Sequence, residues 1–262
     1  MIGFNGGLIG KDRTTTVEAA VGVWTLGEQI KARRTNVWPI VGAVDPSFSS
    51  VSLLLHGNGT NGSTTITDSS SNAVSVTAYG NTAISTTQSK FGGASIYFDG
   101  AGDYALPTAG AGFSFGTSAF TVEAWVYLDG SQASYAGVLG GGPTSNGSFS
   151  LFSAFGNSKF TFNIYGGPQI VAPTTLLNQW VHVALVREGT GTDQTKMYIN
   201  GTSAGSVTYS TNMTFDTFVI GRPYPSNDQE YMKGFIDELR VTKGVARYTA
   251  DFTAPIAPFP DA

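Results

Sequence analysis

A set of apolar side chains alternates with a mixed set along residues 120–128, FTVEAWVYL. Five side chains fall on one side of this segment (Phe120, Val122, Ala124, Val126 and Leu128), and four fall on the other (Thr121, Glu123, Trp125 and Tyr127). Successive side chains of an extended chain point to opposite faces, so this period of two predicts a strand with one face in a core. The second face carries aromatic rings and a carboxylate, which fits a central strand whose other surface is a shallow, partly lined concavity.

Many short segments after residue 50 have the same extended character. The expected strands are 51–56, 63–67, 73–79, 95–99, 104–106, 120–128, 137–139, 148–155, 159–165, 179–187, 196–199, 207–209, 217–220 and 235–241. Turn signals separate them, and the strongest is Asn200-Gly201, because both positions tolerate positive φ. About a dozen short strands at this spacing predict an all-β fold, a two-sheet antiparallel jelly-roll sandwich.

The composition fits one large β domain and argues against several classes of protein. Of 262 residues, 41% are hydrophobic and 12% are charged, so a sizeable core is possible under a surface of Ser, Thr, Asn and Gly. The absence of cysteine excludes disulfides and thiolate metal sites. A net charge of −4 argues against nucleic-acid binding. No apolar run reaches the ~20 residues that span a bilayer, so we expect no membrane association.

Residues 1–45 differ from the rest, because they show no sustained periodic pattern. They hold two large apolar groups, Trp24 and Trp38, together with basic residues that include Arg33 and Arg34. An extended N-terminal arm that buries these rings against another subunit would explain them, and so would an arm that packs back on its own domain. The Asp45-Pro46 step marks the boundary, since the residue before proline is disfavoured in helices. The predicted organisation is an arm over 1–45 and a β domain over 46–262.

Several segments of the second part resemble a known family. They are LLLHGNG (53–59), KFGGASIYFDGAGDY (90–104), FTVEAWVYL (120–128), WVHVALVR (180–187), MYINGT (197–202), FVIGR (218–222) and GFIDELRVTKGVARYTADFTAP (234–255). In this order they resemble the laminin-G-like, concanavalin A-like jelly roll found in many bacteriophage structural proteins. The first 40 residues, with GGLIG (6–10), RTTT (13–16), GVWTLGEQ (22–29) and WP (38–39), look like a leader at the start of tailed-phage virion proteins.

This resemblance implies two antiparallel sheets, but the family includes lectins, glycosidase-attached modules and structural adhesion domains, so the fold does not settle the function. We expect a virion structural protein of a tailed phage, either a capsid decoration or a tail appendage, located in the virion and forming a homo-oligomer. Its arm would dock to other virion proteins through Trp24, Arg33, Arg34 and Trp38. The alternative is an adhesin that binds host surface polysaccharide.

The sequence offers no catalytic constellation, so we expect no enzymatic activity. Glycoside hydrolysis needs two carboxyl groups that face each other across the scissile bond. Glucanases with a concanavalin A-like fold carry a Glu-x-Asp-x-x-Glu run, which is absent here. Asp237 and Glu238 are adjacent on an expected strand, so their side chains should point to opposite faces. A Gly-x-Ser-x-Gly elbow is also absent.

Glycan binding would use aromatic faces that stack on sugar rings. The candidates are Trp125, Tyr127 and Tyr165 on the expected concave sheet, with Tyr135, Tyr224 and Asn227 on loops at its rim. The aromatic content of 12% could equally fill a two-sheet core without any ligand.

One structural calcium ion is the only cofactor that the resemblance implies, at the place where the first and last strands approach. Asp237 in FIDELR resembles the acidic ligand of the family, and Asp68, Asp99 and Asp103 are alternatives on loops. Calcium prefers carboxylate and carbonyl oxygens. Alternatively, Asp237 accepts hydrogen bonds from backbone amides or pairs with Arg240 or Lys243.

Overall fold

The computed structural model describes residues 44–108, 111–132, 135–142, 149–153, 159–164, 166–213, 217–223 and 229–262. Pro46–Asp261 forms one compact unit, and the description below concerns this unit. Trp24, Arg33, Arg34 and Trp38 lie outside the described residues. The N-terminal arm and its docking role therefore stay predictions, as does the domain boundary.

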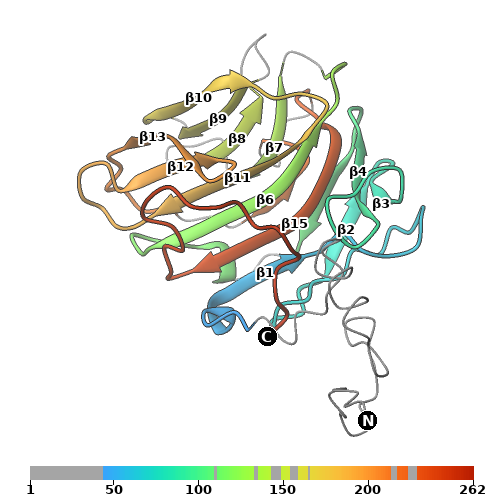
Figure 1. The fold of residues 1–262 in the computed structure, drawn as a ribbon, viewed down its shortest axis with the longest axis horizontal. Coiled ribbons are helices and arrows are strands. Elements are labelled where there is room, and N and C mark those ends of the chain that lie inside the picture. Colours follow the sequence, from blue (N-terminus) through green and yellow to red (C-terminus); the bar gives the residue numbers. More distant parts are fainter. Residues whose placement is uncertain are drawn as a thin grey trace, which may run out of the picture. The chain divides into compact units, whose positions relative to one another are not determined.

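The described residues form fifteen strands and two short 3₁₀ turns, Phe48–Ser50 and Ala111–Phe113. The strands are β1 (Val51–Leu55), β2 (Val76–Tyr79), β3 (Ala83–Ser85), β4 (Ser95–Asp99), β5 (Tyr104–Pro107), β6 (Phe120–Leu128), β7 (Ala136–Gly141), β8 (Phe149–Ser153), β9 (Lys159–Ile164), β10 (Gln169–Thr175), β11 (Trp180–Arg187), β12 (Thr195–Ile199), β13 (Thr202–Val207), β14 (Phe218–Ile220) and β15 (Lys233–Lys243). Figure 1 shows them as two stacked layers with no long helix.

Two antiparallel sheets make up the fold, which confirms the all-β jelly-roll sandwich expected from the sequence. The 8-stranded sheet has the order β13-β12-β11-β6-β15-β4-β3, and β1 pairs with β15 beside β4. The 7-stranded sheet has the order β10-β9-β8-β7-β14-β5-β2. The strand over 120–128 is central, because β6 pairs with β11 on one side and with β15 on the other (Figure 1).

Two of the strands, β3 and β10, were not expected from the sequence, and β13 was expected over 207–209 but spans Thr202–Val207; all three lie at sheet edges. The strand β10 contains Pro173, which cannot donate a ladder hydrogen bond and is tolerated on an edge strand. The strand β3 is only three residues long. Of the strand expected over 63–67, only an isolated bridge from Ile66 to Val76 forms.

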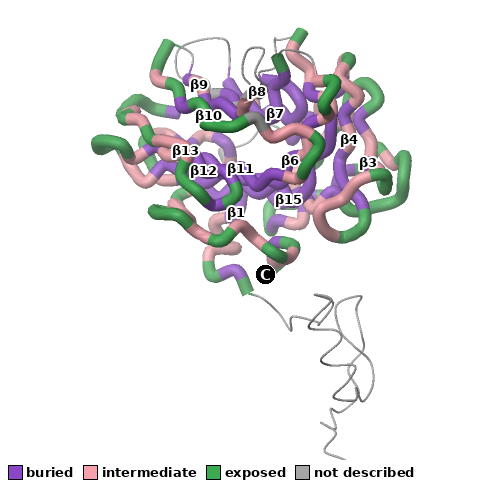
Figure 2. The backbone as a smooth tube through the Cα atoms, turned by 45° about the horizontal axis from the view of Figure 1, so that its top comes forward, coloured by how far each residue is buried: buried purple, intermediate pink, exposed green. Residues whose placement is uncertain are grey.

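The core lies between the two sheets. The five side chains that alternate along one side of β6, from Phe120 to Leu128, are fully buried in it. They meet the inward side chains of the 7-stranded sheet, among them Phe160, Phe162 and Phe218. Figure 2 shows buried backbone along β6, β11 and β15 and exposed segments at the periphery. The alternation that predicted the strand therefore also predicted the core-facing side.

The outer face of the 8-stranded sheet is covered over part of its area by the segment after β15. Tyr248 and Phe252 of this segment pack on Tyr198 of β12, with two further residues of β11 below them. Phe259 packs on Leu54 of β1. The segment over 244–261 thus crosses several strands of the sheet (Figure 1). It divides the outer face into a covered part and an open part.

Candidate functional site

Four aromatic side chains lie abreast on the open part of the 8-stranded sheet. Tyr97 of β4 is paired in register with Phe235 of β15, Phe235 with Tyr127 of β6, and Tyr127 with Trp180 of β11. Neighbouring ring centroids are 5.0 Å, 5.9 Å and 5.8 Å apart in this order. We call these four residues the aromatic row. Strand pairing fixes its spacing, so the rings are held in place before any ligand arrives.

A groove of about 480 Å³ lies along three members of the row, Tyr97, Phe235 and Tyr127, and its volume is within the usual size of small-molecule sites. Its lining combines aromatic rings with polar groups: Ser85, Thr87, Gln88, Tyr97, Tyr127, Asp129, Lys233, Gly234 and Phe235. Tyr97 and Tyr127 are partly exposed, whereas Phe235 is 8% exposed and forms the floor between them. The groove can therefore offer apolar ring faces and hydrogen-bonding groups to one ligand.

Asp129 and Lys233 form a polar cluster at one end of the groove. The Ser131 hydroxyl donates to Asp129 Oδ1 (2.6 Å) and accepts from Lys233 Nζ (2.7 Å). The Ser131 backbone N–H also donates to Asp129 Oδ1, at 2.7 Å. The hydrogen bonds from Ser131, with the Lys233 charge, lower the pKa of Asp129. Asp129 is thus ionised at neutral pH and carries an acceptor toward the groove end.

Trp125 lies one row further along β6, and its ring is covered. The Lys90 ammonium sits 3.8 Å from a Trp125 ring centroid, and Phe91 packs edge-on at 6.1 Å. Trp125 is consequently 5% exposed. Asp237 holds this covering loop, since its Oδ2 accepts hydrogen bonds from the backbone N–H groups of Lys90 (2.7 Å) and Phe91 (3.0 Å). The exposed aromatic surface therefore begins at Tyr127.

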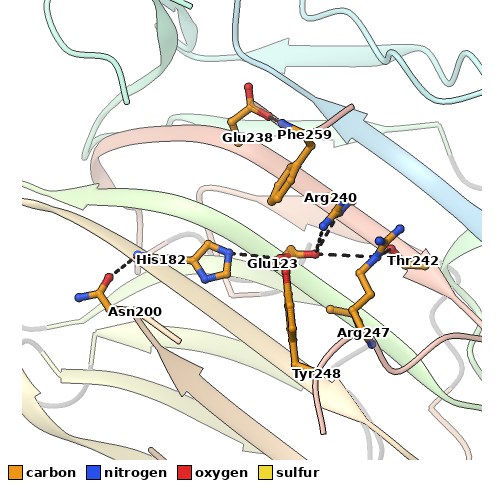
Figure 3. Close-up of polar contacts among 10 residues, drawn as sticks. Glu123, His182, Asn200, Glu238, Arg240, Thr242, Arg247, Tyr248 and Phe259 are labelled. Carbon is orange, nitrogen blue, oxygen red and sulfur yellow. Dashed lines mark hydrogen bonds and ion pairs between the residues drawn. The ribbon is translucent and has the colours of Figure 1, made fainter. Parts of the chain in front are cut away.

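Glu123 occupies the next row and lies under the segment that follows β15, as Figure 3 shows. Arg240 donates to Glu123 Oε1 from Nε (3.0 Å) and Nη2 (2.8 Å). The Tyr248 hydroxyl donates to Oε2 at 2.8 Å, and His182 Nε2 lies 3.2 Å from Oε2. Burial by itself raises the pKa of Glu123, but Arg240 and His182 outweigh it and lower this pKa to about 2. The carboxylate is satisfied by the protein and is out of reach of a substrate.

The expected alternation of Asp237 and Glu238 is interrupted by a β-bulge. The register of β15 against β6 shifts between Asp237 and Arg240, and Glu238 has a φ of 52°. The Glu238 carboxylate bonds to His56 Nδ1 (2.8 Å) and accepts from the Phe259 N–H (2.7 Å). Glu238 therefore helps to fasten the covering segment to the sheet.

The four calcium candidates do not converge. Asp68 accepts hydrogen bonds at both oxygens, three from the backbone N–H groups of Leu54, Ser70 and Val74 and one from the Ser70 hydroxyl, all at 2.8–2.9 Å. Asp99 and Asp103 lie together, and Asp103 Oδ2 accepts from the Asp99 N–H at 2.6 Å. Among the described residues, no three His, Cys, Asp or Glu side chains gather as metal ligands.

Asp237 is the calcium candidate with an unused oxygen. Its Oδ1 is buried without a hydrogen-bond partner, and burial raises its pKa to about 7. The geometry matches the alternative in which Asp237 binds backbone amides. A single carboxylate beside the Lys90 cation does not by itself build a calcium site, which needs six to eight oxygens. The calcium ion stays a prediction.

The remaining glycan candidates lie apart from the aromatic row or outside the described residues. Tyr135 directly precedes β7 in the other sheet and is 39% exposed. Tyr165, Tyr224 and Asn227 lie outside the described residues. Sequence reasoning therefore named one member of the row as a candidate, Tyr127.

Sequence reasoning missed three members of the site, namely Tyr97, Phe235 and Trp180. Alternation along 95–99 could place Tyr97 on an outer face, but its neighbours depend on strand order. The row exists because β4, β15, β6 and β11 are adjacent, although they are far apart in the chain.

The fold and the exposed surface define a lectin-like jelly-roll domain. A laminin-G family model, described as the Concanavalin A-like lectin/glucanases superfamily, matches residues 98–247. This is more than half of the chain, and the chain belongs to this superfamily. A search of curated protein sequences finds no match. Nothing in these comparisons indicates a phage virion origin.

Several solved structures share the fold. Domain 4 of AbnA, an extracellular GH43 arabinanase from Geobacillus stearothermophilus, in complex with arabinotriose, is 20% identical with a TM-score of 0.55, over 75% of this chain and 94% of that one. A structure of botulinum neurotoxin type C, which interacts with two ganglioside molecules, is 15% identical (TM-score 0.57; 76% of this chain, 49% of that one). Trypanosoma rangeli sialidase with sialic acid is 17% identical (TM-score 0.58; 84% and 37%). At these identities the similarity shows a shared fold, and this chain spans half or less of the toxin and the sialidase.

None of the helices in the described residues is long and apolar enough to cross a membrane.

Proposed function

We propose that this domain binds a glycan noncovalently at the aromatic row and its groove. The observation on which this proposal rests is the row itself, in which strand pairing holds four aromatic rings at fixed spacing on one face of the sheet. An aromatic ring packs against the C–H face of a sugar, and the polar groups of the groove hydrogen-bond its hydroxyls. Because the sheet positions the rings in advance, little conformational entropy is lost on binding.

The similar structures support the class of ligand. The arabinanase domain, of which this chain covers 94%, was solved with an oligosaccharide. The toxin and sialidase structures also concern carbohydrate-containing ligands. The similarity of fold supports a carbohydrate as the ligand, whereas the groove is the reason for placing the binding site on this face of the sheet.

We further propose that the domain has no glycosidase activity. Glu123 is enclosed by Arg240, His182 and Tyr248, and Glu238 is bonded to His56 and Phe259. Both carboxylates therefore serve the fold. Incubation with a broad panel of polysaccharides should release no reducing ends, and any release that Tyr127→Ala abolishes would overturn this part of the proposal.

Glycan-array binding by the full chain tests the site. Tyr127→Ala and Tyr97→Ala each remove a stacking ring and should weaken binding by about tenfold or more, as loss of a central aromatic contact does in other interfaces. Tyr79→Ala is the matched control, because Tyr79 is a 40% exposed tyrosine on β2 of the other sheet. Equal binding by all three variants and the wild type, with unchanged melting temperatures, would refute the proposed surface.

A virion role is a second proposal, compatible with the first. It is supported by the resemblance of the first 40 residues to the leader of tailed-phage virion proteins. In this proposal the arm docks to the capsid or tail through Trp24, Arg33, Arg34 and Trp38, and the jelly roll is displayed as part of a homo-oligomer. Deletion of residues 1–45 should leave a folded domain that no longer joins the particle, and normal incorporation would refute the docking role.

A further inference from the structure

Asp129 and Lys233 line the end of the groove, and a second aspartate, Asp99, lies beside Lys233 just outside this lining. Lys233 of β15 is paired in register with Asp99 of β4. On its other side the Asp129 backbone N–H donates to the Lys233 carbonyl oxygen, at 3.0 Å. The order across the three strand ends is therefore Asp99, Lys233, Asp129, and the set has a net charge of −1 when all three are ionised.

The positive charge of Lys233 is already used within this set. Its ammonium donates to Ser131, which in turn donates to Asp129. Burial raises the pKa of Asp99, but hydrogen bonds from Asn81 and the Ala101 N–H outweigh it and lower this pKa, and the Lys233 charge adds to the lowering at both Asp99 and Asp129. Among the described residues that line the groove, Lys233 is the only cation. A ligand carboxylate at this end would have to compete with two aspartates for one ammonium.

The Tyr97 hydroxyl lies in the same negative potential. Burial raises its pKa first, and the charges of Asp99, Asp103 and Asp129 raise it further. Three separate carboxylates therefore act on a ring that forms one wall of the groove. The potential extends from the polar end to the aromatic row.

We infer that the groove selects a neutral glycan and disfavours glycans that carry sialic acid or uronic acid. The inference rests on the proposed function, whose site it deepens. Neutral sugar hydroxyls can donate to Asp129, which binds Ser131 through Oδ1 and keeps Oδ2 for a ligand. A ligand carboxylate at this end would meet two like charges, and Lys233, the one cation among the described lining residues, already donates to Ser131. The likeness to a sialidase bound to sialic acid would by itself suggest the opposite preference.

Matched glycan pairs test this inference with the full chain. Each pair consists of a neutral oligosaccharide and the same oligosaccharide capped with sialic acid or with a uronic acid. The wild type should bind the neutral member about tenfold tighter or more, the ratio that like-charge contacts at a partly exposed site produce. Because salt screens exposed charges, the ratio of the two affinities should decrease as the salt concentration is raised.

Charge-removing variants assign the preference to the two aspartates. In the double variant Asp99→Asn/Asp129→Asn, the affinities for the two members of a pair should differ by no more than about threefold, chiefly because the acidic member binds more tightly. Asp193→Asn is the matched control, because Asp193 is an exposed aspartate in the turn after β11, away from the groove, and it should leave the ratio unchanged.

The outcomes separate this inference from the proposed function. Binding that Tyr127→Ala weakens but that favours the acidic member would overturn the charge inference alone. A ratio that the double variant leaves unchanged would do the same. If no glycan binds, or if Tyr127→Ala affects none of the binding, both the proposed function and this inference are wrong.

Discussion

Replacing Asp237 by Asn should make the protein more stable at pH 8 and leave its stability nearly unchanged at pH 4. Asp237 is fully buried, and its Oδ1 has no hydrogen-bond partner. Burial is the main reason that its pKa rises from 3.8 to about 7. The folded state therefore binds a proton that the unfolded state releases between these two pH values. Stability falls as pH rises through this window, because only the unfolded state gains free energy from releasing this proton.

The pKa difference sets the size of the effect. At about 1.4 kcal/mol for each tenfold change in proton affinity, the rise of Asp237 from 3.8 to about 7 corresponds to at most about 4 kcal/mol. Relaxation and water entry reduce such penalties, so we expect a gain of about 1–2 kcal/mol at pH 8. An asparagine carbonyl can still accept from the N–H groups of Lys90 and Phe91, so the loop contact is kept.

Urea unfolding of wild type and Asp237→Asn across pH 4–8 measures this effect. The difference in unfolding free energy between the two proteins should grow with pH, and Asp193→Asn should show no such growth. Comparing variant with wild type cancels the titration of other groups, His56 among them. A variant that is less stable than the wild type at pH 8, or a difference independent of pH, would refute the reasoning.

Three further outcomes are expected. His56 bonds to Glu238 and Asp261, and these carboxylates outweigh the effect of burial and raise the pKa of His56 from 6.5 to about 9. The protonated imidazole therefore contributes fully to stability below pH 6.5, and this contribution is lost as pH rises through 9. Thermal melts should show this loss, about 1–2 kcal/mol, in wild type but not in His56→Gln, and parallel pH profiles would contradict it. Glu123→Gln removes the buried negative charge that Arg240 binds and should lower the free energy of unfolding by about 3–5 kcal/mol in urea, whereas a change below about 1 kcal/mol would show that the pair is dispensable. If Asp237 holds a calcium ion, the melting temperature should be higher with Ca²⁺ than with a chelator, and Asp237→Asn should abolish this difference. The same melting temperature with and without Ca²⁺ would reject the calcium prediction.

The covering segment explains why the sequence could predict which side chains of β6 point outward but not which of them are accessible to solvent. Glu123 and Trp125 alternate with Tyr127 on the same side of β6, so the pattern treats them alike. In the structure, Glu123 lies under the segment after β15, Trp125 lies under Lys90, and Tyr127 is open to solvent. Which loop returns over which strand is a long-range property, and it decides whether an outward side chain is structural or accessible.

By itself, the sequence determined most of the strands and the core side of the central strand. A period of two and turn residues are local signals, and they suffice for an all-β sandwich. Only the tertiary structure decided the candidate site, because Tyr97, Phe235, Tyr127 and Trp180 become neighbours through the order of four strands that are distant in sequence. The charge at the groove end has the same origin: Asp99, Lys233 and Asp129 meet because three strand ends are held abreast by backbone hydrogen bonds, which no local pattern encodes.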